Sequence, residues 1–171
     1  MQTDQRMKCK LVRLESLSGG KASIYSILID KDNETLFEQF VMEHMSSFKD
    51  ETNDIIKRLR TIGQKTGARA QFFKEHEGKP GDGVCALYDD PDRKLRLYCI
   101  RYGLSLVVVG DGGYKDKSIR AYQEDERLRK ACEFVQLLSS RITACIRNKE
   151  IRLIMEGYDF DGDLEFNLKE D

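Results

Sequence analysis

The alternation of apolar and polar residues predicts a β-hairpin at the start of the chain. Residues Lys8–Leu17 and Ser23–Ile29 both read as strands, the second rich in Ile and Tyr. Between them, Ser18–Lys21 contains two glycines, which supply positive φ without steric cost and are typical of a turn. These two strands and their turn are therefore expected to pair as a hairpin.

Apolar side chains then recur at three- and four-residue spacing, which predicts two amphipathic helices. The first covers residues 36–48, with Asp32 or Asn33 as its expected N-cap. His44 lies on the apolar stripe of this helix, and we expect it to be packed in the core. The second helix covers residues 51–64 after a short polar break, so the two should form an antiparallel helical hairpin.

The middle of the chain reads as a group of strands. Their predicted spans are Ala70–His76, Val84–Tyr88, Leu95–Tyr102 and Leu104–Val109. Leu106–Val109 is continuously apolar, as expected of a central strand buried on both faces. The glycine-rich run Gly110–Gly113 is interpreted as the turn that follows it.

A long helix and two short β-prone segments complete the pattern. The helix is expected over residues 124–147, and the segments over 151–155 and 164–168. This order predicts an α+β fold: a small antiparallel sheet with a helical hairpin and a C-terminal helix packed on one side of it. We expect one domain over residues 1–171, made of an N-terminal β-hairpin (1–30), a core (31–147) and an acidic C-terminal extension (148–171).

Composition narrows the class of protein. Of 171 residues, 40% are hydrophobic and 35% are charged, and no apolar run approaches the ~18 residues of a membrane span. The first ten residues lack the apolar stretch of a signal peptide, so we expect a cytoplasmic protein. The five cysteines are widely spaced and include no C-x-x-C pair. Reduced thiols packed in the core are therefore favoured over disulfides or a metal site.

Charge is unevenly distributed along the chain. The formal net charge is -1, but residues 150–171 hold eight acidic and two basic residues, so the remainder is mildly basic. The basic remainder of the chain could bind a polyanion, and the acidic C-terminal residues could cover that surface or bind a partner.

The densest cations fall within the strand group and the segment after it. They are Arg93, Lys94, Arg96, Arg101, Lys115, Lys117 and Arg120. Side chains alternate in a strand, so Arg96, Tyr98 and Tyr102 should share one face while Arg101 lies on the apolar face. The face with Arg96 and the tyrosines could contact RNA phosphates and stack on bases, or it could be an ordinary, partly solvated face of the sheet. Arg101 could be paired structurally or directed into a site.

The order of these segments resembles the RelE/ParE toxin superfamily, in particular its HigB-like branch. The resemblance rests on Phe72–Glu77, Val84–Tyr88, Leu95–Tyr102, Leu106–Val109 and Lys115, followed by the charged amphipathic helix. It covers roughly residues 30–147 and implies a RelE-like fold.

The resemblance further implies a toxin of a type II toxin–antitoxin pair. Such a protein would cleave mRNA on the ribosome through attack by the 2′-hydroxyl, without metal or cofactor, and would be held by an antitoxin, expected to be a helix-turn-helix protein encoded next to it. By position, the candidate catalytic residues are Arg96, Arg101, Lys115 and His76. The candidate RNA-binding residues are Arg93, Tyr98, Tyr102, Lys117 and Arg120.

Two alternatives stay open at this point. The chain could be a catalytically inactive RelE-like protein-interaction module, with its cations held in ion pairs and its acidic tail against the sheet. It could also handle nucleotides with Gly110–Gly113, although the spacing of this run is not that of a phosphate-binding P-loop. Residues 159–163 do not form a calcium loop either, because their glycine is the fourth residue and not the sixth.

Overall fold

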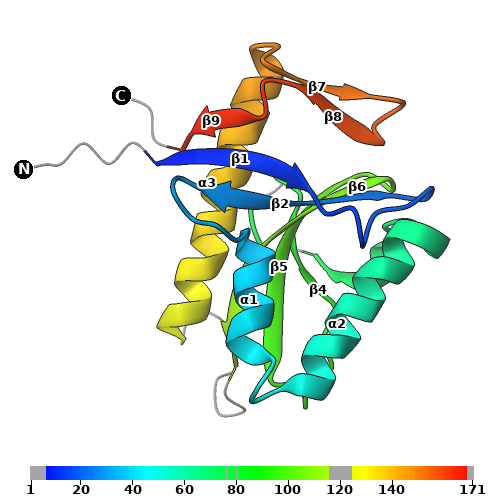
Figure 1. Ribbon diagram of the computed structural model, residues 1–171, viewed down its shortest axis with the longest axis vertical. Coiled ribbons are helices and arrows are strands. Elements are labelled where there is room, and N and C mark those ends of the chain that lie inside the picture. Colours follow the sequence, from blue (N-terminus) through cyan, green and yellow to red (C-terminus); the bar gives the residue numbers. More distant parts are fainter. Residues whose placement is uncertain (1–6, 76, 80, 116–124, 169–171) are drawn as a thin grey trace, which may run out of the picture.

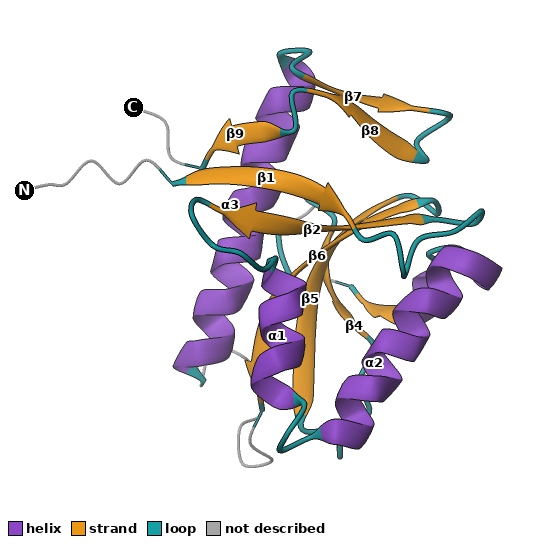
Figure 2. Ribbon diagram, viewed as in Figure 1, coloured by secondary structure: helices purple, strands orange, loops and turns teal. Residues whose placement is uncertain are grey.

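The computed structural model describes residues 7–75, 77–79, 81–115 and 125–168. The strands are β1 (Lys8–Arg13), β2 (Ser23–Ile29), β3 (Phe73–Lys74), β4 (Val84–Leu87), β5 (Leu95–Tyr102), β6 (Leu106–Tyr114), β7 (Ile151–Ile154), β8 (Asp159–Gly162) and β9 (Glu165–Asn167). The helices are α1 (Leu36–His44), α2 (Lys49–Thr61) and α3 (Glu126–Arg147), with short π and 3₁₀ turns at Ile62–Thr66 and Ala70–Phe72. The α+β class is therefore confirmed (Figure 1, Figure 2).

The main sheet is mixed and not purely antiparallel as predicted. Its seven strands run in the order β3-β4-β5-β6-β2-β1-β9, and β2 pairs in parallel with β6 while the other pairs are antiparallel. The connection from β2 to β6 passes through α1, α2 and three further strands, and a parallel pair needs such a long crossover. Strands β7 and β8 form a separate hairpin.

Helices cover both faces of the sheet, which corrects the prediction that they lie on one side. Residues of α3, among them Val135 and Leu138, pack with Tyr98 and Val108 on one face. On the other face, α1 and α2 pack with the alternate strand residues, such as Leu97. Figure 1 shows α3 and the pair α1–α2 on opposite sides of β5 and β6. As predicted, Leu106–Val109 is buried on both faces.

Side-chain caps set the starts of two helices. The N-cap of α1 is Thr35, two or three residues after the predicted caps: its hydroxyl accepts from the Glu38 N–H, and the Glu38 carboxylate accepts from the Thr35 N–H. Asp125 caps α3 by accepting from the Leu128 N–H at 3.0 Å. As expected, His44 is buried, with its ring 4.7 Å from that of Phe40.

The C-terminal strands are held against this sheet. β9 pairs with β1, and the β7–β8 hairpin places Phe160 against the rings of Tyr25 and Tyr102 at 5.0 and 5.5 Å. All five cysteines are buried, in agreement with the prediction of packed thiols. Within the described ranges, no helix combines the length and apolar character needed to cross a membrane.

The run Gly110–Gly113 lies inside β6 and is not a turn, which corrects the sequence interpretation. A Cβ at Gly112 would lie 2.0 Å from the Arg96 carbonyl oxygen, next to a register shift between Leu97 and Cys99. A Cβ at Gly110 would lie 2.6 Å from Val135 Cγ2 of α3. The glycines therefore mark close approaches of a neighbouring strand and a helix.

Replacing Gly110 with alanine should weaken the packing of α3 on the sheet. The added methyl group would overlap Val135, and overpacking of this kind costs about 1–3 kcal/mol of unfolding free energy. Urea unfolding of Gly110→Ala measures this loss. Gly20→Ala, whose Cβ would have no neighbour within 4 Å, should unfold within about 1 kcal/mol of the wild type. Equal stability of the two variants would contradict this packing.

Candidate functional site

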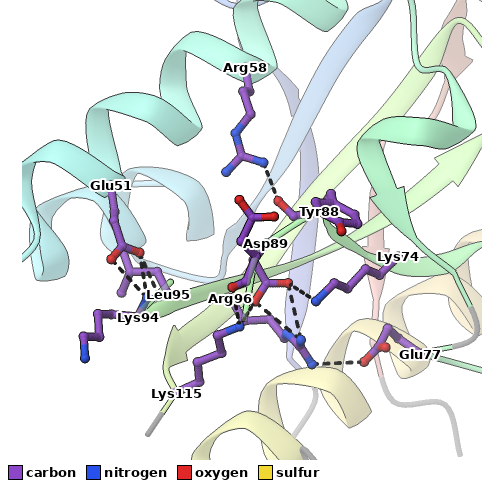
Figure 3. Close-up of polar contacts among 11 residues, drawn as sticks. Glu51, Arg58, Lys74, Glu77, Tyr88, Asp89, Lys94, Leu95, Arg96 and Lys115 are labelled. Atoms are coloured by element: carbon purple, nitrogen blue, oxygen red, sulfur yellow. Dashed lines mark hydrogen bonds and ion pairs between the residues drawn. The ribbon is translucent and has the colours of Figure 1, made fainter. Parts of the chain in front are cut away.

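Three cations from separate strands meet at one carboxylate. Lys74 of β3, Arg96 of β5 and Lys115, which follows β6, all contact Asp89 just after β4 (Figure 3). Lys74 Nζ lies 3.0 Å from Asp89 Oδ1, and Arg96 Nη2 lies 3.3 and 3.4 Å from the two carboxylate oxygens. Lys115 Nζ donates to Asp89 Oδ2. We call these four residues the Asp89 cluster.

The Asp89 cluster is largely closed to solvent. Asp89 is 3% exposed, and the side chains of Arg96 and Lys115 are each 15% exposed. Burial raises the pKa of the Asp89 carboxyl, but hydrogen bonds from Lys115 and Lys74 and the charge of Arg96 outweigh it, so the pKa lies below its usual value. Asp89 is therefore ionised at neutral pH and holds the three cations in place.

A second carboxylate adjoins the Asp89 cluster. Arg96 Nη1 lies 3.7 Å from Glu77 Oε1, and burial raises the pKa of Glu77 although the charge of Arg96 opposes the shift. The Glu77 carbonyl accepts hydrogen bonds from Cys132 Sγ at 3.1 Å and Gln136 Nε2 at 3.2 Å, both on α3. Arg96 is thus held between two carboxylates, and the segment after β3 is tied to α3.

Polar contacts with α2 fix the turn between β4 and β5. The Glu51 carboxylate accepts from the N–H groups of Lys94 and Leu95 at 2.9–3.1 Å, and Arg58 donates to the Tyr88 carbonyl (Figure 3). Tyr88 is 45% exposed, and Lys74 Nζ lies 5.3 Å from the centroid of its ring. An exposed aromatic ring beside a lysine is a combination that RNA-binding surfaces use for stacking on bases.

The predicted RNA-reading face is covered by α3. Arg96, Tyr98 and Tyr102 do share one face of β5, as the alternation predicts. Tyr98 is 0% exposed, however, and Tyr102 is half-buried. Burial raises the pKa of both tyrosines. Neither ring is presented to a base in this structure.

Arg101 lies apart from the Asp89 cluster, on the opposite face of β5. Its Nε donates to the Ala68 carbonyl at 2.8 Å, and its guanidinium lies 5.7 Å from the centroid of the Phe73 ring. Of the candidate catalytic residues, Arg96 and Lys115 are therefore brought together in the structure, whereas Arg101 is not. Arg93 lies at a third place, with its Nη2 3.9 Å from Oδ2 of Asp54 on α2. The candidates His76, Lys117 and Arg120 lie outside the described residues.

Sequence reasoning missed the residue at the centre of the site. Asp89 belongs to a run of acidic residues that reads as a turn, and only the pairing of β3, β4 and β5 brings it to Lys74 and Arg96. The signal in the sequence was that Asp89 directly follows the predicted strand Val84–Tyr88. At the end of a strand, a carboxylate can contact side chains of the neighbouring strands.

The chemistry that the site can perform follows from its charges. Lys74, Arg96 and Lys115 all contact Asp89, and Arg96 also contacts Glu77, so two carboxylates face three cations and offset at most two of the three positive charges. Among the described residues, no group of three or more His, Cys, Asp or Glu side chains could hold a metal ion.

A comparison of this chain with known protein families, curated proteins and solved structures found no match.

Replacing Asp89 with asparagine should destabilise the fold strongly at neutral pH. Three cations would lose their shared anion, and breaking a buried ion pair costs about 3–5 kcal/mol, somewhat less here because Lys74 is 28% exposed. Asp90→Asn, at the exposed neighbouring position, is the matched control and should change stability by less than about 0.5 kcal/mol.

The pH dependence of this difference has a defined sign. The folded-state pKa of Asp89 is lowered, so its stabilisation is fully present above the unfolded value of about 3.9 and is lost as pH falls through the folded value. Chemical denaturation at pH 7, 5 and 3 should therefore show a constant gap between wild type and Asp89→Asn down to pH 5, and a smaller gap at pH 3. A gap that widens on acidification would contradict the role of Asp89.

Proposed function

We propose that this chain is a RelE-like interaction module, which acts by binding a partner protein and does not cleave RNA. The observation that supports this proposal is the position of Asp89, whose carboxylate occupies the point at which Lys74, Arg96 and Lys115 converge.

Cleavage through the 2′-hydroxyl requires cations that are free to stabilise the charge developing on the scissile phosphate. Here an RNA phosphate would have to displace an ionised, buried carboxylate of the same charge sign. Asp89 is also a poor proton acceptor, because the cations that surround it lower its pKa. The same three contacts that stabilise the fold thus work against catalysis at this point.

The arrangement of the layers favours contact through sheet edges, loops and helix surfaces. Helices pack on both faces of the sheet, and β9 of the acidic extension pairs along β1. The resemblance to toxin–antitoxin proteins supplies the class of partner: a small helix-turn-helix protein encoded next to this chain.

Expression in bacteria, alone and together with the product of the neighbouring gene, tests the proposal. We expect the two proteins to co-purify as a complex of defined stoichiometry. We also expect mRNA from cells that express this chain alone to show no new 5′ ends by primer extension. Either a failure to form the complex or the appearance of new 5′ ends would contradict the proposal.

A metal-independent endoribonuclease toxin is the second candidate. It is favoured by the convergence of Lys74, Arg96 and Lys115 from three separate strand regions, beside the exposed ring of Tyr88. In that case, growth would stop and cleaved mRNA would appear. Lys115→Ala would abolish both effects while the purified variant still unfolded cooperatively, and Arg152→Ala, far along the chain on β7, would leave them unchanged.

A further inference from the structure

A groove of about 630 Å³ lies between α1, α2 and residues 12–17, at the end of β1 and just after it. Figure 1 shows the two helices spreading apart from the loop that joins them, with the connection from β1 to β2 near their open end. The residues that line the groove do not include any of the Asp89 cluster. A volume of this size accommodates several side chains of a bound partner.

The groove is lined by apolar side chains that the fold covers only in part. Leu14, Val41 and Ile56 are partly buried and pack against the core cluster that contains Phe37. Met42, which also lines the groove, is 65% exposed. Apolar side chains that gather at one exposed place with charges around them are typical of an interaction site.

The charges at the rim of the groove differ between its two helical walls. Glu34 and Glu38 lie at the start of α1, and Arg60 lies on α2. Within the described part of the chain, none of these three side chains forms an ion pair within 4.0 Å, whereas Arg13 and Glu15 pair with each other. The groove is therefore acidic along α1 and basic on α2. A nucleic acid backbone would meet two unpaired carboxylates and an apolar floor, so the groove favours a protein.

The backbone beside the groove offers few groups to an extended peptide. The N–H groups of Leu17 and Ser18 donate to the Leu14 carbonyl at 3.1 and 3.0 Å, and the Ser16 carbonyl accepts from Arg60 Nε at 3.4 Å. The other two walls are helices, whose backbone groups bond to one another. A ligand here must satisfy its own backbone hydrogen bonds, as an α-helix does.

We propose that this groove receives an amphipathic α-helix of the partner protein, with the apolar stripe of that helix against Met42 and Ile56. The inference rests on the proposed function, because it assigns the surface that binds the partner and the chemistry of the partner segment. The rim charges set the orientation of the helix. Lysine or arginine side chains are expected along the edge that faces Glu34 and Glu38, and a carboxylate along the edge that faces Arg60.

Isothermal titration calorimetry with the purified product of the neighbouring gene tests this assignment. Met42→Glu adds a charge to the groove at an exposed position, so the variant should fold while its Kd rises at least about tenfold. Met155→Glu is the matched control, because Met155 is 68% exposed on the turn after β7 and lies outside the groove. Its Kd should stay within about twofold of the wild type. Urea unfolding of both variants separates lost binding from lost folding, and equal Kd values for the two would overturn the proposal.

A second pair of variants tests the orientation set by the charges. Glu34→Lys should weaken binding about threefold or more, because it would place a cation against the basic edge of the helix. Asp92→Lys, with the same change of charge at an exposed position in the turn between β4 and β5, should leave the Kd unchanged. Tighter binding by Glu34→Lys, or equal effects of the two changes, would contradict this orientation.

Two further measurements identify the occupant. Hydrogen exchange of the partner in the complex should show protection in one helical segment with an apolar stripe, and protection of an extended segment would contradict the proposal. Sedimentation velocity of this chain alone should show a monomer, since a dimer that Met42→Glu dissociates would mean that a second copy fills the groove. A wild type that forms no complex would contradict the proposed function itself. A complex that is insensitive to Met42→Glu would leave that function standing and remove only the groove.

Discussion

The ion pairs of Asp89 with Lys74, Arg96 and Lys115 join four parts of the sheet region. A carboxylate that is 3% exposed loses the solvation of water, and it remains charged only because cations surround it. The converse also holds, since Arg96 and Lys115 are themselves mostly buried and need an anion. Each charge is thus tolerated because of the others, and this mutual dependence fixes β3, β5 and the end of β6 around the residue that follows β4.

The same constraint decides what the surface can do. Asp89 and Glu77 together offset at most two of the three positive charges, but the point on which the cations converge is itself occupied by a carboxylate, so the site resembles an occupied anion pocket more than an open one. The packing of α3 also works against RNA binding. It buries Tyr98 and partly buries Tyr102, which lie on the face of β5 that was predicted to contact RNA. Arg101, on the opposite face of β5, donates from its Nε to the Ala68 carbonyl and lines a separate cavity.

Local pattern predicted those elements whose own residues determine them. The hairpin β1–β2, the three helices and the fully buried stretch Leu106–Val109 follow from apolar spacing alone. The alternation along β5 also places Arg96 and Tyr98 on one face correctly. What it cannot reveal is which layer covers that face. The parallel pairing of β2 with β6 and the position of α3 depend on contacts between segments far apart in the sequence. Gly110–Gly113 was misread because glycine is equally consistent with a turn and with a strand under close approach.

The central claim is that Asp89 is an ionised carboxylate that holds three cations, and the most direct measurement is its own titration. The ¹³C chemical shift of the Asp89 side-chain carboxyl, followed by NMR from neutral to acidic pH, reports its pKa in the folded protein. The structure predicts a midpoint below the ordinary aspartate value of about 3.9. A midpoint at or above that value would mean that the cations do not converge on Asp89, and would contradict the account.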